Sequence, residues 1–290
     1  MLFRSYDIEA QELYRRVKEA EQLGATEVCL QGGIHPDYTG QTYLDILQTV
    51  REASSDIHIH AFSPLEIHQG ASTLGLPVAE YLALLKDAGL GSLPGTAAEV
   101  LDDRVRAVLC PDKVSSAQWL EIMEAAHNLG LRSTATIMFG HVDDPTSWVE
   151  HWQRVIGLQQ RTGGFTEVVP LPFVSAGAPI YRRGLSRPGP TWREAVLMHA
   201  VLRLTLGSII PNVQASWVKL GREGALQMLS CGANDLGGAL INESITRAAG
   251  AAHGQVWTPN EMRGAIVANG RVAQQRSTLY QPLEAALQRP

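Results

Sequence analysis

The chain has 290 residues, of which 45% are hydrophobic and 18% are charged. This composition excludes an intrinsically disordered chain, and the length allows one large α/β domain to bury a substantial core. With 24 basic against 29 acidic residues the formal net charge is -5, so no basic surface for nucleic acid or anionic lipid is expected. No apolar run approaches the ~20 residues that cross a membrane, and no signal peptide follows Met1, so we expect a cytoplasmic protein.

The three cysteines, Cys29, Cys110 and Cys231, lie far apart and form no ligand cluster such as C-x-x-C. An odd number without a spacing pattern argues against a disulfide framework and suits a reducing compartment. We interpret all three as small buried side chains and expect no metal ligands among them.

Helical and strand patterns alternate along the chain. Repeated units of this kind predict an α/β fold with a parallel sheet and right-handed crossovers, either open or closed as a TIM-type barrel. Helices are predicted at 7–23, 43–53, 77–88, from a cap at Ser116 to Gly130, at 146–160, at 191–210, and from a capping box at 258–261. Strands are predicted at 25–30, 56–62, 90–93, 132–139 and 165–169.

The order of these elements is unusual, because a barrel of this type begins with a strand and here a helix comes first. The first strand is therefore expected to be absent, which would leave unpaired strand edges. No linker or repeat interrupts the pattern, so residues 1–290 are interpreted as one incomplete barrel domain, with 240–290 as a C-terminal extension.

In a parallel α/β sheet, functional residues lie where strands end. Gln31-Gly32-Gly33 end the first visible strand, and paired glycines let a ligand approach the backbone, although a plain turn has the same sequence. In the next strand, period-two alternation places His58, His60 and Phe62 on the interior face. The two histidines could bind a metal or a polar substrate, or could be satisfied internally.

Further polar residues follow the later strands. Glu99 and Arg106 are seven residues apart, so on one helix they would share a face and could hold the two ends of an amino acid, or form a surface ion pair. Thr134 and Thr136 share a face of their strand and could donate hydroxyls inward, and His141 follows that strand. Late in the chain, Asn234-Asp235 and Asn242-Glu243 are polar runs among small and apolar residues and are interpreted as substrate-binding loops.

These motifs carry a family resemblance. The chain resembles the second subunit, or C-terminal half, of FO synthase, a radical S-adenosylmethionine (SAM) enzyme. The resemblance runs from the first helix to Pro282 and rests on these segments: ATEVCLQGGIHP, HIHAFSPLEI, LPGTAAEVLDDRVRAVLCPDK, LRSTATIMFGHVDDP, FTEVVPLPFV, PNVQASWVKLG, GANDLGGALINESITRAAGA and QQRSTLYQP.

The resemblance implies a reaction and its cofactors. A [4Fe-4S] cluster cleaves SAM, the resulting radical takes a hydrogen from L-tyrosine, and the 4-hydroxybenzyl fragment joins 5-amino-6-(D-ribitylamino)uracil. The product is the precursor of the deazaflavin FO, and the implied partner is the ring-closing first-half enzyme of FO synthase, separate or fused. The resemblance assigns SAM binding to Gln31, Gly32, Gly33, Ser63, Glu99 and Arg106, and it aligns His58, His60, His141, Asn234, Asp235, Asn242 and Glu243 with strand-end positions for tyrosine or the uracil. Among these we expect substrate binding by His58, His60, Asn234 and Asn242, and catalysis by His141, Asp235 and Glu243. Thr134 and Thr136 are added to the substrate-binding set because of their shared strand face.

The sequence departs from the family in one respect. The family holds its cluster with C-x3-C-x2-C between the first strand and the first helix, and this motif is absent here. Iron–sulfur clusters need thiolate ligands, so we expect an N-terminally truncated form that is inactive alone. Two alternatives stay open: a metal-dependent hydrolase that uses His58, His60, His141 and Asp235, and a non-catalytic SAM- or uracil-binding remnant.

Overall fold

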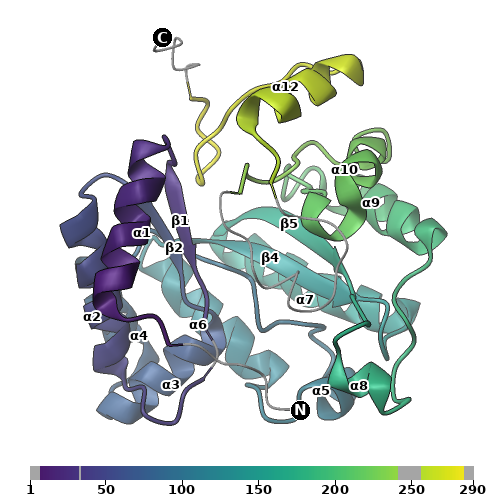
Figure 1. Cartoon of the computed structure of the whole chain (residues 1–290). Coiled ribbons are helices and arrows are strands. Elements are labelled where there is room, and N and C mark those ends of the chain that lie inside the picture. Colours follow the sequence, from purple (N-terminus) through teal and green to yellow (C-terminus); the bar gives the residue numbers. More distant parts are fainter. Residues whose placement is uncertain (1–6, 33, 241–255, 284–290) are drawn as a thin grey trace.

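A sheet of five parallel strands, in the order β1-β2-β3-β4-β5, forms the centre of the molecule (Figure 1). The computed structural model describes residues 7–32, 34–240 and 256–283. The strands are β1 (Glu27–Leu30), β2 (His58–Ala61), β3 (Ser92–Leu93), β4 (Arg132–Phe139) and β5 (Phe165–Pro172). The helices are α1 (Ala10–Gln22), α2 (Gly40–Ala53), α3 (Pro64–Leu74), α4 (Val78–Asp87), α5 (Asp103–Leu109), α6 (Ser116–Asn128), α7 (Pro145–Thr162), α8 (Pro179–Arg182), α9 (Trp192–Leu206), α10 (Trp217–Met228) and α12 (Pro259–Ala268).

Successive strands are sheet neighbours, and each connection between them carries at least one helix, as parallel pairing requires. Beyond β5, the parallel bridges Val168↔Val213 and Gln214↔Asp235 extend the sheet by two short segments. The predicted α/β fold of parallel strand–helix units is confirmed. The helices α3, α5, α8 and α10 were not predicted. For α5 and α8 the reason is their length, because such short elements give too few residues for a periodic pattern.

Some predicted boundaries differ from the observed ones. The strand expected at 90–93 is reduced to Ser92–Leu93, and Ser116 is the first residue of α6, whereas Ser115 is its N-cap. The helix expected at 191–210 ends at Leu206. For the last of these, the apolar residues Ile209 and Ile210 continue the pattern past the end of the helix, so the pattern alone did not mark that end.

The edge of the sheet at β1 is open in the part of the chain that the structure describes. Glu27 to Leu30 pair with His58 to Ala61 on one side, and no described strand pairs with the other side. The described residues that precede α1, 7–9, contain no strand, and the expected absence of a first strand stays a prediction.

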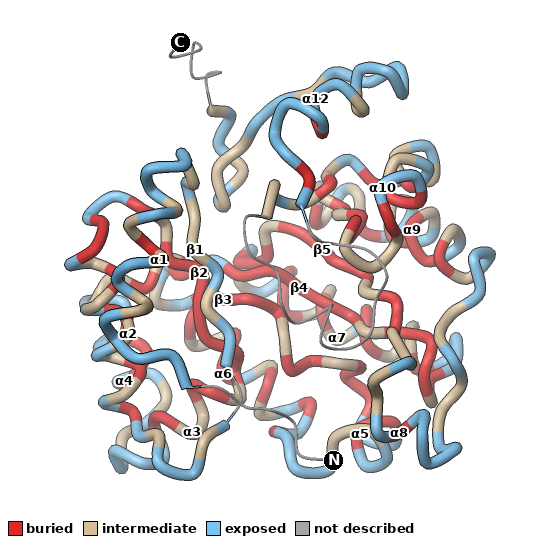
Figure 2. Tube along the Cα trace, viewed as in Figure 1, coloured by how far each residue is buried: buried red, intermediate tan, exposed pale blue. Residues whose placement is uncertain are grey.

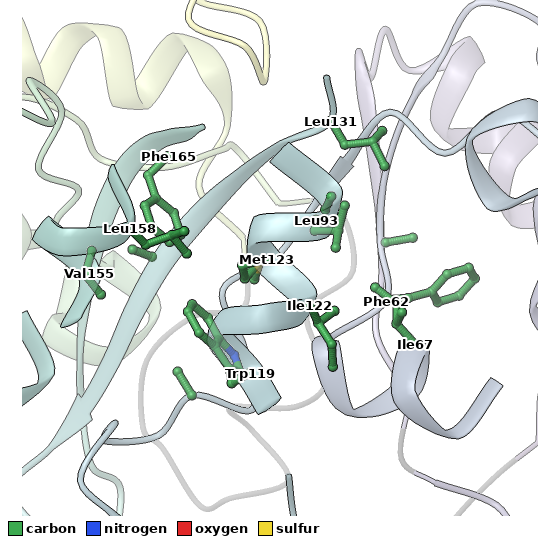
Figure 3. Close-up of a cluster of buried hydrophobic side chains, with 14 of the residues drawn as sticks. Phe62, Ile67, Leu93, Trp119, Ile122, Met123, Leu131, Val155, Leu158 and Phe165 are labelled. Atoms are coloured by element: carbon green, nitrogen blue, oxygen red, sulfur yellow. The ribbon is translucent and has the colours of Figure 1, made fainter. Parts of the chain in front are cut away.

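The main core lies between the sheet and the helices that cover it, and buried residues concentrate along the strands (Figure 2). Leu93 of β3, Trp119 of α6 and Phe165 of β5 meet there, with the rings of Trp119 and Phe165 stacked at 6.2 Å (Figure 3). Leu93 and Trp119 are completely buried. Burial of such large side chains supplies most of the driving force that holds each helix on the sheet.

A second apolar cluster joins the C-terminal part of the chain to α10. Trp217 at the start of α10 packs edge-to-face against Trp257, with ring centroids 5.6 Å apart, and Met262 of α12 belongs to the same cluster. The assignment of 240–290 as an extension of a single domain stays a prediction. Its described part is nevertheless packed against the rest of the chain through these side chains.

Residues 276–282, here called the C-terminal strap, connect the two edges of the sheet. The strap doubles back on itself through an Arg276↔Pro282 bridge. Thr278 donates a hydrogen bond to Glu27 of β1, and Arg276 Nε lies 2.6 Å from Asp235 Oδ2 at the far edge. Figure 1 shows the strap and α12 at the opposite end of the molecule from α5 and α8. The strap therefore links the open β1 edge to the last bridged segment of the sheet.

Buried ionic contacts hold the strap in place. Glu167 of β5 accepts hydrogen bonds from Tyr280 Oη at 2.5 Å and from Gln214 Nε2 at 3.0 Å, and Arg276 Nη2 lies 3.5 Å from it. The Glu167 and Asp235 side chains are only 7% and 9% exposed. Burial raises the pKa of the Glu167 carboxyl, so its charged form depends on Arg276.

None of the described helices is long and apolar enough to span a bilayer.

We expect Arg276→Met to lower the free energy of unfolding by about 2–4 kcal/mol, because it leaves two buried carboxylates without their cation. Arg161→Met is the matched control: it removes an exposed pair with Glu124 (2.9 Å) and should cost at most about 1 kcal/mol. Urea unfolding followed by circular dichroism measures both values. Equal losses in the two variants would show that the strap network does not stabilise the fold.

His127 makes the stability of the fold depend on pH. Its ring nitrogens lie 2.8 Å from Thr162 Oγ1 and 2.7 Å from Ser133 Oγ, and burial lowers its pKa to about 4. Because the folded pKa is below the unfolded value of about 6.5, His127 contributes stability above that pH and loses it as pH falls toward 4. Between pH 7 and pH 4.5, the free energy of unfolding of His127→Gln should therefore fall by roughly 2 kcal/mol less than that of the wild type. Parallel stability curves for the two proteins would contradict this role.

Candidate functional site

The carboxyl ends of the five strands meet at one edge of the sheet, as parallel pairing dictates. The first strand to end there is β1, and it is followed by Gln31 and Gly32, which are both exposed. The Gly32 amide donates a hydrogen bond of 2.9 Å to Glu66 Oε1 of α3. Gly33, the third residue of this predicted motif, lies outside the described residues.

Ser63 follows β2 and is the N-cap of α3. Its hydroxyl donates to Glu66 Oε2 at 2.7 Å, its backbone amide donates to the same oxygen at 2.7 Å, and it accepts from the Glu66 amide. Ser63 is therefore occupied by its capping box in this structure. Sequence reasoning missed Glu66, although the order Ser-Pro-Leu-Glu is the recognisable signature of such a box.

Backbone strain gathers at the ends of β2 and β3. Phe62, Ala97 and Glu99 have φ values of 60°, 60° and 46°, a left-handed conformation that costs non-glycine residues about 1 kcal/mol or more. Because of its unusual φ, Phe62 packs against Tyr43 of α2, with ring centroids 4.9 Å apart. The prediction that Phe62 shares the interior face with the two histidines is therefore wrong. Strain of this kind is typical of ligand-binding loops.

His58 and His60 lie on β2 and share one partner on β3. His58 Nε2 and His60 Nδ1 are each 2.7 Å from Ser92 Oγ. Burial lowers the pKa of His58 and lowers that of His60 to about 4, so both rings are neutral near pH 7. One nitrogen of each ring is thus satisfied internally, one of the alternatives that the sequence left open.

Thr134 and Thr136 of β4 hold the end of β3. Thr134 Oγ1 accepts a hydrogen bond of 2.7 Å from the Gly95 amide, and Thr136 Oγ1 donates to the Gly95 carbonyl. A Cβ at Gly95 would lie 2.5 Å from the Thr134 carbonyl oxygen, so this approach requires glycine. The two hydroxyls, predicted to point inward to substrate, are engaged with backbone in this structure.

Glu99 and Arg106 do not share a helix. Glu99 lies in a bend before α5, and only Arg106 is helical, so the predicted common helix face is wrong. The strained segment from Ala97 to Glu99 keeps Glu99 out of the helix, which begins only at Asp103. Glu99 instead forms a 2.6 Å pair with Lys113.

Arg106 is 3% exposed and donates to three carbonyl oxygens of the loops around it. These acceptors are Ala97 at 3.2 Å, Ala98, and Val114 at 3.1 Å. Because its donors are directed at backbone, Arg106 fixes the shape of the loop that carries Glu99. The loop therefore lies at the strand end, whereas the guanidinium of Arg106 is buried beneath it.

His141 lies beyond β4 with its side chain fully buried. His141 Nε2 lies 2.8 Å from the Met138 carbonyl oxygen, and Nδ1 accepts from the Val142 amide at 2.7 Å. Burial lowers its pKa, which favours this neutral state. The Asp143 carboxylate accepts from the amides of Gly140 and His141 and closes the turn. This geometry indicates that His141 holds the loop in shape, rather than serving the predicted catalytic role.

The late polar residues lie level with the amino-terminal half of β5. Asn234 Oδ1 accepts from Arg203 Nη2 at 2.6 Å and from the Val213 amide at 2.8 Å. Asp235 pairs with Arg276 of the strap. The structure therefore does not bring Asn234 and Asp235 to the strand ends where Gly32 and Glu99 lie. Asn242 and Glu243 fall outside the described residues.

The residues that the structure describes do not form a metal centre. Cys29 lies in β1, Cys110 directly follows α5 and Cys231 follows α10, so their thiols come from three separate parts of the fold. Among the residues that the structure describes, no three His, Cys, Asp or Glu side chains are grouped to hold a metal ion. They therefore do not fit an iron–sulfur cluster. The hydrolase alternative based on His58, His60, His141 and Asp235 is wrong for the same reason.

Two strand ends carry polar groups that could meet a ligand. Gly32 exposes backbone at the end of β1, and Thr96 Oγ1, after β3, is buried with no hydrogen-bond partner in the described chain. A buried hydroxyl without a partner is costly, so a small polar ligand is a candidate partner at these strand ends.

Comparisons with known proteins agree with the fold. The model of the radical SAM superfamily matches residues 1–153, and that of the CofH/MqnC C-terminal region matches residues 162–289. The crystal structure of methylornithine synthase (PylB) superposes with a TM-score of 0.69 at 18% identity, covering 94% of this chain and 76% of that one. At this identity the superposition shows a shared TIM-barrel-type fold only.

Three curated relatives are considerably more similar. FO synthase of Streptomyces coelicolor is 48% identical over 285 residues, which are 98% of this chain but 33% of that protein. The 5-amino-6-(D-ribitylamino)uracil–L-tyrosine 4-hydroxyphenyl transferases of Methanopyrus kandleri and Methanocaldococcus jannaschii are 48% and 46% identical, over 97% of this chain and 76% and 79% of theirs. The chain thus spans about a third of the Streptomyces protein. It belongs to the radical SAM superfamily, in the family of the 5-amino-6-(D-ribitylamino)uracil–L-tyrosine 4-hydroxyphenyl transferases.

Proposed function

We propose that this chain is the SAM- and substrate-binding part of a transferase that joins the 4-hydroxybenzyl group of L-tyrosine to 5-amino-6-(D-ribitylamino)uracil, in deazaflavin (FO) biosynthesis. The observation that carries the proposal is 46–48% identity, over 97% of the chain, to two proteins of that name. A similar identity to FO synthase supports the implied partner, the ring-closing first-half enzyme.

SAM is assigned to the ends of β1, β2 and β3. Support comes from the exposed backbone at Gln31 and Gly32 and from the loop that carries Glu99. Arg106 contributes by holding that loop through its carbonyl contacts. Ser63 contributes by capping α3 beside the same strand ends. Gly33 completes the motif by resemblance.

Tyrosine and the uracil are assigned to the interior polar face of the sheet. Each histidine uses one ring nitrogen on Ser92 Oγ, and we assign the other ring nitrogen of His58 and of His60 to substrate. Thr134 and Thr136 lie on β4, which pairs with β3 beside these histidines. The roles of Asn234 and Asn242 in binding, and of His141, Asp235 and Glu243 in catalysis, remain predictions from resemblance. The contacts of His141 and Asp235 described above indicate instead that these residues hold the loop after β4 and the C-terminal strap in position.

The iron–sulfur cluster of the superfamily has no thiolate set among these residues, so the proposal for this chain stops at binding. It assigns no electron-transfer or radical step to the described side chains. A second candidate function, a non-catalytic binding remnant, predicts the same binding behaviour, and the two differ only in whether thiolates are supplied from elsewhere.

Isothermal titration calorimetry of the 290-residue chain tests the proposal. We expect SAM and 5-amino-6-(D-ribitylamino)uracil each to bind with 1:1 stoichiometry, because the strand-end loops and the interior face offer separate polar groups. Adenosine, which lacks the amino-acid part, should bind at least about tenfold more weakly than SAM, since a lost charge-assisted contact costs roughly 1.5–3 kcal/mol. A chain that binds neither SAM nor the uracil contradicts the proposed function.

The genomic DNA upstream of the Met1 codon separates the two candidates. An in-frame C-x3-C-x2-C there would favour the transferase, and deoxyadenosine formation by the extended, reconstituted protein would establish it. Binding of SAM without deoxyadenosine formation by any such extended protein would favour the non-catalytic remnant.

A further inference from the structure

Glu66 is a buried carboxylate that links two strand ends in the proposed SAM site. It is 2% exposed, lies in the first turn of α3, and was not singled out by the sequence. Its two oxygens accept from three donors: the Ser63 amide, the Ser63 hydroxyl and the Gly32 amide. The first two belong to the local cap of α3, whereas the third comes from the end of β1.

The contact with Gly32 matters because β1 is an edge strand. Its pairing with β2 ends at Leu30↔Ala61, followed by a hydrogen bond from the Phe62 amide to the Leu30 carbonyl. Glu66 then holds Gly32, two residues further along, against the end of β2. We propose that Glu66 is a positioning residue that fixes the Gly32 backbone for the amino-acid part of SAM. This inference rests on the proposed function.

The chain itself shows why a carboxylate is needed there. In α6, Ser115 and Gln118 form the same capping box, with the Ser115 amide donating to Gln118 Oε1 at 2.9 Å. An amide side chain is therefore sufficient for a cap. It has only one acceptor oxygen, however, so it cannot serve Ser63 and Gly32 together, and its NH2 group would face one of the two amide donors. Glu66→Gln is thus a near-isosteric change that breaks one of the two links.

The test uses the 290-residue chain in two measurements. Amide hydrogen exchange is followed without ligand, and the Kd for SAM is measured by titration. In Glu66→Gln we expect the Gly32 amide to exchange about tenfold faster and the Kd for SAM to rise about tenfold, because a hydrogen bond to a charged acceptor is lost. The matched control is Glu261→Gln in the Thr258 capping box of α12, which makes the same chemical change without a strand contact. The control should leave both quantities unchanged.

Each outcome has one reading. Unchanged exchange at Gly32 in Glu66→Gln overturns the inference, because the tether then does not hold the loop. Faster exchange with an unchanged Kd also overturns it, because the loop is then held for some purpose other than SAM. Failure of the wild-type chain to bind SAM is distinguishable from both: it removes the proposed function and with it the role given to Glu66.

Discussion

A buried ion network and the strap that carries it join the two edges of this parallel sheet. Arg276 lies between Asp235 at one edge and Glu167 of β5, and Thr278 reaches Glu27 at the other edge. Neither carboxylate is stable in a buried position without the guanidinium, so strap and sheet edges depend on each other. The stacking of Arg276 on Tyr280, with 4.1 Å from Cζ to the ring centroid, gives the network a fixed geometry.

The two ends of the sheet therefore differ in how their polar groups are satisfied. The strap and its ionic partners lie level with the amino-terminal half of β5, where every described polar side chain of the network has a partner within the chain. At the carboxyl ends, by contrast, backbone at Gly32 is exposed and Thr96 Oγ1 has no partner in the described residues. A polar group without a partner is costly unless a ligand satisfies it, which is why the carboxyl ends are the better candidate for binding.

The sequence predicted the fold well, because strand–helix alternation is a long-range repeating pattern. It also located the strand ends at Gly32, Glu99 and His141. It could not show which way each polar side chain turns. Arg106 is directed at backbone carbonyls because Ala97 and Glu99 adopt left-handed conformations, and nothing in their residue types signals this. Arg276 is 41 residues from Asp235, and a contact of that range has no local pattern.

Several side chains that the sequence assigned to ligands, and one that it did not single out, bind backbone instead. Thr134 and Thr136 hold both polar groups of Gly95, Arg106 holds three carbonyls, and Glu66 holds Gly32. A ligand recognised by backbone groups needs those groups fixed in advance, because each loop that must be ordered on binding subtracts from the affinity. The strained residues at the ends of β2 and β3 persist because such ties over-determine their conformation. The polar side chains at these strand ends thus act mainly by fixing the shape of the backbone, which is what the proposed SAM site would require.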